Sequence, residues 1–480
     1  MPGRKNIFVQ LFQYLRALGK RVFDRLASNR LKHSMLTAIP FWTGSFIVAV
    51  IAVIYAWLFH HAELLMFNII GYKKWLIFLI LPAGFILSWW IVKTFAPYAK
   101  GSGIPQVIAS IELAAPENEK KVSKLLSLRI IVVKILSSLA LVLGGGNIGR
   151  EGPTIQISGS VFNIINRIIP KWWPKVSPRN MILTGAAAGL SAAFNTPLGG
   201  IVFAVEDLTK IHFSYFKTAV FAAVIIAGLT AQQLAGSYLY LGYPKVAQLD
   251  LKEYFIVMLV AAIAGLSAAV MKRVIMAILK FRKMLKDNKQ QVIFLLVSST
   301  IVACFAYFIH ESILTSGKDL MEHYLFTDDK HAEGIIPFSR VLGNTLSFTA
   351  GGAGGIFAPA LSSGATIGSA VAGWFKLGAP QTNVMILAGM VGFLVGITRS
   401  PFTSAILVLE MTDRHSIILH LMTAALVALV FARLVSARSL YDTLKVVYLK
   451  ELEEEDLIAN PSPQVEKANM PKQVPPPGDT

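Results

Sequence analysis

The sequence predicts an all-α polytopic membrane protein, and its composition and long uncharged segments are the first two reasons. Of the 480 residues, 54% are hydrophobic and 15% are charged, and the mean hydropathy is +0.59. Soluble domains carry about 25% charged residues. Windows such as 37–59 and 75–92 contain no charged residue, and each is long enough to cross a hydrocarbon core of about 30 Å as a helix. We expect about ten or more such helices in a lipid bilayer, since a barrel would show short alternating segments instead.

The third reason is an internal repeat. Residues 181–206, MILTGAAAGLSAAFNTPLGGIVFAVE, align without a gap with residues 385–410, MILAGMVGFLVGITRSPFTSAILVLE. GREGPTIQISG from Gly149 also aligns with GIFAPALSSGA from Gly355, at an offset of 206 that places Pro153 over Pro359. Glycines, prolines and glutamates fall in register, which chance similarity between apolar segments explains poorly. The chain is therefore predicted to contain two related halves, as many transporters do, with a binding site where the halves meet.

These patterns divide the chain into three regions. Residues 35–447 are predicted to form the transmembrane domain, with repeat halves at about 33–210 and 250–445. Residues 1–34 are predicted to form a basic amphipathic helix on the cytoplasmic membrane surface. Residues 448–480 are predicted to be a short cytoplasmic tail, and their acidic, then Pro-, Gln- and Lys-rich composition predicts disorder.

The net charge of +18 is typical of membrane topology rather than of nucleic-acid binding. Residues 1–32 hold eight Lys or Arg and one Asp, and the stretch 272–289 is also strongly basic. Basic loops face the cytoplasm and an anionic inner leaflet. We therefore expect no nucleic-acid partner, and we expect both termini to be cytoplasmic.

Three short segments break the hydrophobic body with glycines and a proline: GSGIP at 101–105, GREGP at 149–153 and GGIFAP at 354–359. Each is predicted to be a loop that starts a helix inside the membrane, because glycine turns tightly and proline favours a first helical turn. A helix start presents unpaired N–H groups and about half a positive charge, which favours an anion. Several starts at one point would bind a small anion weakly enough to release it. The alternative for each segment alone is a close helix–helix contact through small residues.

Arg150 and Glu151 are the only charged residues between Lys134 and Arg167. A carboxylate at a helix start can occupy a place suited to an anion, and in a low-dielectric site it can take up a proton. Glu151 is therefore predicted to couple proton occupancy to anion occupancy. The alternative is a buried ion pair with the neighbouring Arg150.

Enzyme chemistry finds little support in the sequence, and we expect no enzyme activity and no cofactor. The single cysteine, Cys304, excludes a disulfide framework or a cysteine-rich metal site. His310 and Glu311 begin an HExxH pattern, but Leu314 stands where the second histidine would be. The chain also contains no GxSxG nucleophile elbow and no phosphate-binding loop. An intramembrane hydrolase is therefore only a remote alternative.

The three glycine-rich segments, in this order and spacing, resemble the CLC family of chloride channels and chloride/proton antiporters. The resemblance covers about 35–445. It implies a homodimer with one anion pathway in each subunit, and a fold of two inverted halves with broken helices. Without the cytoplasmic CBS domains common in eukaryotic relatives, the chain resembles a prokaryotic member, which implies a bacterial inner membrane.

The resemblance implies a role for individual residues. Ser102 would lend its hydroxyl, Ile356 and Phe357 their backbone amides, and Tyr441 of SARSLYDTL its phenol to a central chloride. Glu151 would be the gating glutamate that accepts a proton. Without the resemblance, the sequence favours an interfacial anchor as the role of Tyr441. Supporting positions in the same motifs are Gly101, Gly103, Gly149, Arg150, Gly152, Pro153 and Gly355, and Lys134 is expected to be buried and to assist the anion pathway electrostatically.

Antiporters of the family usually carry a second, inward-facing glutamate directly after a first one. The first matches Glu206, and the second position here holds Asp207, which is shorter by one methylene. Because Asp207 is still a carboxylate, it favours proton transfer and antiport. The alternative for Asp207 is that it lies at a solvated cytoplasmic helix end. The alternative for Glu206 is that it is a buried hydrogen-bond acceptor with a structural role.

The sequence as a whole favours exchange of chloride for protons. A passive voltage- or pH-gated chloride channel of the same family is the main alternative. A fluoride exchanger is disfavoured because GSGIP and GREGP keep the chloride-type residues, and a nitrate exchanger is disfavoured by Ser102.

Overall fold

The computed structural model describes residues 29–170, 172–209, 217–236 and 240–459. The predicted N-terminal amphipathic helix lies mostly outside these residues, and the part that is described, from Asn29, already belongs to the first long helix. The helices of the first half are α2 (Asn29–Tyr72), α3 (Ile77–Phe95), α4 (Ile104–Glu112), α5 (Glu119–Leu125), α6 (Leu128–Leu143), α7 (Glu151–Ile168), α8 (Pro178–Phe194), α9 (Pro197–Phe203) with the π-helical turn η4 (Ala204–Thr209), and α10 (Lys217–Ala235).

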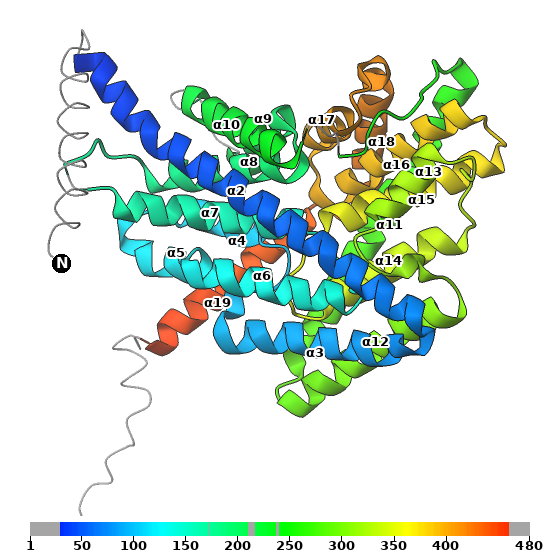
Figure 1. The fold of residues 1–480 in the computed structure, drawn as a ribbon, viewed down its shortest axis with the longest axis horizontal. Coiled ribbons are helices and arrows are strands. Elements are labelled where there is room, and N and C mark those ends of the chain that lie inside the picture. The colour runs from blue at the N-terminus through cyan, green and yellow to red at the C-terminus, as the bar shows by residue number, and fades with distance from the viewer. Residues whose placement is uncertain (1–28, 171, 210–216, 237–239, 460–480) are drawn as a thin grey trace, which may run out of the picture.

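Most helices of the second half lie on the right of the view in Figure 1. Its helices are α11 (Leu251–Met284), α12 (Asn288–Phe308), α13 (Lys318–Phe326), α14 (Ile335–Thr349), α15 (Phe357–Trp374), α16 (Ala379–Thr398), α17 (Pro401–Thr412), α18 (Ile418–Val435) and α19 (Leu440–Ala459). Eight helical segments among the described residues are long and apolar enough to cross a membrane. The predicted all-α polytopic fold is confirmed.

The helix boundaries repeat at the spacing seen in the sequence. Helix α7 begins at Glu151 and α15 begins at Phe357, and both contain 18 residues. After α8 and α16 the chain turns through a left-handed residue, Asn195 with φ of 56° and Arg399 with φ of 66°. Asparagine tolerates this region better than arginine does. The repeated turn therefore reflects the shared geometry of the halves and not the local preference of each residue.

The two halves cap each other reciprocally. The Glu206 carboxylate accepts hydrogen bonds from the amides of Phe402 (3.2 Å) and Thr403 (2.6 Å) at the start of α17. Its repeat mate Glu410 accepts from Leu198 (3.1 Å) and Gly199 (2.8 Å) at the start of α9. A carboxylate is well suited to the unpaired N–H groups of a helix start. The structure thus gives Glu206 the structural acceptor role.

The glycine-rich loops pair along the line where the halves meet. Gly149 and Gly355, which the repeat aligns, exchange two backbone hydrogen bonds of 2.8 and 2.7 Å in an antiparallel bridge. Gly101 donates to the carbonyl of Gly352 at 2.8 Å and accepts from the amide of Gly354 at 3.1 Å. All three predicted helix breaks are therefore held together by backbone pairing.

The predicted boundary of a disordered tail at 448 is wrong for residues 448–459, because α19 continues through them to Ala459. Tyr448 and Leu452 are buried, and the acidic side chains that follow pair with lysines of distant segments. Composition alone predicts disorder there because it does not reveal those partners. Residues 460–480 lie outside the described part of the chain.

We predict that Glu206→Ala and Glu410→Ala each lower the melting temperature of the purified protein, because each leaves a helix start uncapped. Loss of one cap costs about 1 kcal/mol, which corresponds to a shift of about 1 °C for a chain of 480 residues. Thermal unfolding in detergent measures this, with Glu333→Ala at an exposed position as the control. Melting temperatures equal to that of the control for both variants would contradict the capping role.

Candidate functional site

The backbone pairing described above brings the starts of three helices to one place. Gly103, with a left-handed φ of 103°, caps α4, while Arg150 and Ile356 precede the first residues of α7 and α15. Paired backbones lie about 5 Å apart, so these helix starts are close neighbours. The amides of Ile356 and Phe357 have no carbonyl to bind within their own helix, because they stand at its beginning. The predicted cluster of positive helix ends is therefore present.

Two hydroxyls lie beside these helix starts. Ser102 and Tyr441 are 1% and 2% exposed. Their hydroxyls lie near one another, but neither is within hydrogen-bonding geometry of another polar atom among the described residues. The ring of Tyr441 stacks on that of Phe357 with centroids 6.2 Å apart. Buried hydroxyls normally have partners. These two hydroxyl donors have no partner and lie next to a helix start, so the arrangement is suited to binding an anion.

Glycine is required where these elements touch. A Cβ atom on Gly152 would lie 2.3 Å from the Ser102 hydroxyl oxygen and 3.3 Å from the Cα of Gly355. A Cβ on Gly355 would meet the ring of Pro153 at 3.0 Å. The first turn of α7 therefore packs directly against both the serine loop and the start of the α15 segment.

Glu151 is the first residue of α7, and its side chain is 1% exposed. The hydroxyl of Tyr240 donates to Oε1 at 3.3 Å, whereas Oε2 makes no hydrogen bond to the described residues and lies against the Cα of Gly149. The neighbouring Arg150 donates to the carbonyl of Ala56 on α2 at 3.0 Å. The backbone amides of Glu151 itself and of Ala358 also lie near this carboxylate, so it sits at the starts of both α7 and α15.

A cavity of about 520 Å³ gives Glu151 access to the surface. Its lining includes Glu63, Arg150, Glu151, Tyr240 and Lys318. Glu151 therefore lies between this mixed-charge cavity and the buried hydroxyls of the site. Nothing in the local sequence marks Tyr240, whose ring also packs against that of Phe194 at the end of α8, with centroids 5.1 Å apart.

Lys134 is fully buried, as predicted. Its ammonium nitrogen donates to the carbonyls of Ala99 (2.9 Å) and Gly101 (2.7 Å). One helical turn on, the Ser137 hydroxyl accepts from the amide of Ala353 at 3.0 Å. Helix α6 thus fixes both loops around Ser102, and the electrostatic contribution of Lys134 stays a prediction.

Asp207 lies on the π-helical turn η4 and is half-buried. It accepts a hydrogen bond from the hydroxyl of Ser400 and is close enough to Tyr441 to act on that phenol electrostatically. Glu151 and Asp207 therefore approach the site from different elements. Ser400 was not predicted, although it is the repeat mate of Thr196 and, like it, directly precedes a helix-starting proline.

Comparisons with known proteins agree with this architecture. Residues 83–433 match the family model described as voltage gated chloride channel. H(+)/Cl(-) exchange transporter ClcA of Cronobacter sakazakii is 28% identical over 380 residues, covering 77% of this chain and 79% of that protein. The ClcA protein of Vibrio cholerae is 29% identical over 384 residues, covering 77% and 80%.

Two solved structures share the fold. A slow cyanobacterial Cl⁻/H⁺ antiporter superposes with a TM-score of 0.75 at 22% identity, covering 88% of this chain and 99% of that one. A CLC-type fluoride/proton antiporter superposes with a TM-score of 0.71 at 17% identity, covering 86% and 98%. At these identities the likeness concerns the fold alone.

We predict that Gly152→Ala weakens chloride binding by at least about tenfold, since an added methyl must displace the Ser102 hydroxyl and a loss near 1.4 kcal/mol already gives that factor. Isothermal titration of the purified protein with chloride measures the change. Gly334→Ala is the control, because a Cβ there meets nothing within 4 Å. Equal chloride affinities for the two variants would exclude Ser102 and Gly152 from the binding site.

Proposed function

Because the chain belongs to the family of voltage gated chloride channels, we propose that it exchanges chloride for protons across a membrane. The relatives named as H(+)/Cl(-) exchange transporters support this reading. The observation that carries it is Glu151, a buried carboxylate at a helix start, with one oxygen unpaired, between an open cavity and a pair of unpartnered hydroxyls.

In this proposal chloride binds between the hydroxyls of Ser102 and Tyr441 and the amides of Ile356 and Phe357. These donors carry only partial charges. A full cation in a low-dielectric site would hold the ion too tightly for rapid release. Lys134 does not contact the proposed chloride directly. Its ammonium nitrogen donates to the carbonyls of Ala99 and Gly101, and it acts on the site through this loop.

Glu151 is the gate and the proton acceptor. Ionised, its carboxylate occupies the positive start of α7 and competes with chloride. Protonated, it is no longer attracted there and turns towards the cavity, so that chloride passes. Tyr240 holds one of its oxygens at 3.3 Å in the position that the structure records.

Asp207 delivers protons from the opposite side of the site. Its position near Tyr441 and its hydrogen bond from Ser400 support the assignment. Because aspartate is shorter than glutamate by one methylene, proton transfer across the gap to Glu151 needs bridging water.

A passive chloride channel of the same family, opened by voltage or pH, is the second candidate, and the description of the matching family model supports it. The carboxylates of Glu151 and Asp207 favour the exchanger over the channel. In liposomes, an imposed chloride gradient drives protons uphill only in an exchanger. We further propose a homodimer in a bacterial inner membrane with both termini in the cytoplasm, on the basis of the family and of the basic stretch 272–289.

We predict that Glu151→Ala keeps chloride flux and loses proton coupling, because the variant has no carboxylate to carry the proton. Paired recordings of chloride and proton flux from proteoliposomes measure both quantities. Proton flux should fall at least about tenfold, as for a removed general acid–base group. Proton transport at the wild-type level would refute the role of Glu151.

We predict that Asp207→Ala reduces proton flux more than chloride flux, because only the proton route passes through this carboxylate. Asp207→Glu is the matched control, and it should retain proton flux at the wild-type level or above it. The same paired recordings give both ratios. If Asp207→Ala lowered the two fluxes in equal proportion, Asp207 would not lie on a proton route.

A further inference from the structure

Helix α19 links the candidate anion site to an acidic segment at its far end. Tyr441, Tyr448 and Glu455 are seven residues apart, which is about two helical turns, so they lie on one face of the helix. Helix α19 packs against α4 and α16, and in Figure 1 it crosses back to the helices of the first half. Whatever holds this face also sets the position of Tyr441.

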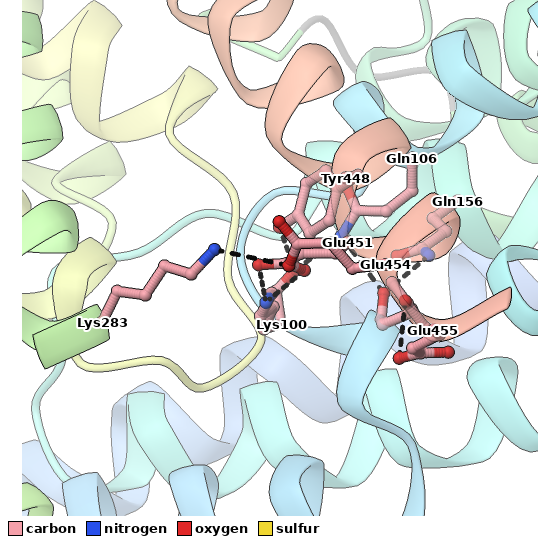
Figure 2. Close-up of polar contacts among 9 residues, drawn as sticks. Lys100, Gln106, Gln156, Lys283, Tyr448, Glu451, Glu454 and Glu455 are labelled. Carbon is pink, nitrogen blue, oxygen red and sulfur yellow. Dashed lines mark hydrogen bonds and ion pairs between the residues drawn. The ribbon is translucent and has the colours of Figure 1, made fainter. Parts of the chain in front are cut away.

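The middle of this face is attached to the segment that leads into Ser102. The Lys100 ammonium binds the Glu451 carboxylate at 2.9 and 3.2 Å and lies 5.3 Å from the centre of the Tyr448 ring. The Tyr448 hydroxyl donates to the Lys100 carbonyl at 3.5 Å. Figure 2 shows these groups converging from the helix and the loop. Lys100 therefore joins α19 to a point two residues before Ser102.

The far end of the same face is held by further lysines. The Glu455 carboxylate accepts from the Tyr98 hydroxyl and from the Lys124 ammonium, both at 2.8 Å. Asp456 pairs with Lys121 at 2.8 Å. Glu454 faces Lys283 at 3.8 Å (Figure 2). An exposed ion pair contributes little alone, whereas several that hold one rigid helix act on the same position together.

We propose that Lys100, Tyr448, Glu451 and Glu455 form a clasp that positions Tyr441 against Ser102 from outside the anion site. The inference rests on the proposed chloride site. The clasp spans both sides of the hydroxyl pair, because Lys100 belongs to the serine loop and its partners Tyr448 and Glu451 belong to the tyrosine helix. Glu455 holds the far end of that helix through Tyr98 and Lys124. A small displacement of α19 would widen the gap between the two hydroxyls without removing either one.

The Glu455 carboxylate at the far end of the clasp stays ionised in mild acid. Burial opposes ionisation of Glu455, but the hydrogen bonds from Lys124 and Tyr98 outweigh it and hold its pKa below the usual value. Hydrogen bonding to Lys121 likewise lowers the pKa of Asp456. A carboxyl with a lowered folded-state pKa contributes stability above its unfolded-state pKa and loses it only as pH falls through the folded value.

The test compares Lys100→Gln and Glu451→Gln with the charge-swapped double variant Lys100→Glu/Glu451→Lys. Chloride titration gives the dissociation constant, paired flux recordings give turnover and coupling, and thermal unfolding reports on the fold. Each single variant should weaken chloride binding by about fivefold, as expected for a loss near 1 kcal/mol, and the double variant should restore it. Glu453→Gln is the control, because this exposed residue lies on the same helix and has no ion pair within the described part of the chain.

Chloride affinity at the wild-type level in both single variants would overturn the clasp, and so would a double variant that fails to recover. A purely structural role would lower the melting temperature and leave the dissociation constant unchanged. Should a single variant fail to fold, Glu455→Gln at the exposed end of the helix serves in its place, with weaker chloride binding again expected. If the wild-type protein itself binds no chloride, the proposed function fails first, and the two failures are thereby distinguished.

Discussion

The structure depends on one short contact, the pair of backbone hydrogen bonds between Gly149 and Gly355. The two residues are equivalent positions of the repeat, so the contact joins the halves at their common axis. It places the starts of α7 and α15 side by side, and Gly101 adds the start of α4 through its own backbone pairing. Irregular backbone at membrane depth needs protein partners. Here the glycine-rich loops form backbone hydrogen bonds with one another. The N–H groups at the helix starts that remain unpaired are the ones proposed to bind an anion.

The rest of the molecule supports that contact. Lys134 and Ser137 on α6 bind the loops around it, and the reciprocal caps of Glu206 and Glu410 hold the halves together at a second place. Helix α19 then brings Tyr441 to the opposite side of Ser102. In the proposed mechanism, helix dipoles and hydroxyls select a weakly bound anion, and the carboxylate of Glu151, at the start of α7, competes with that anion.

Much of this arrangement could be predicted from the sequence, because it depends on residues with special backbone roles. Gly149, Pro153 and their repeat mates mark helix breaks whatever surrounds them, and the registered glutamates mark the repeat. Tyr240 and Ser400 could not be predicted as neighbours of Glu151 and Asp207, because long-range folding alone brings them there. The helical structure of residues 448–459 could not be predicted for the same reason, since their lysine partners come from three distant segments.

The claim that helix starts and hydroxyls hold the anion is tested most directly by locating the ion. Crystals of the protein grown in bromide should give an anomalous difference peak between the Ser102 and Tyr441 hydroxyls, adjoining the amides of Ile356 and Phe357. The peak should rise further towards the position of the Glu151 carboxylate when that side chain is removed. A well-ordered map with bromide bound elsewhere in the protein, and none between Ser102 and Tyr441, would contradict the account.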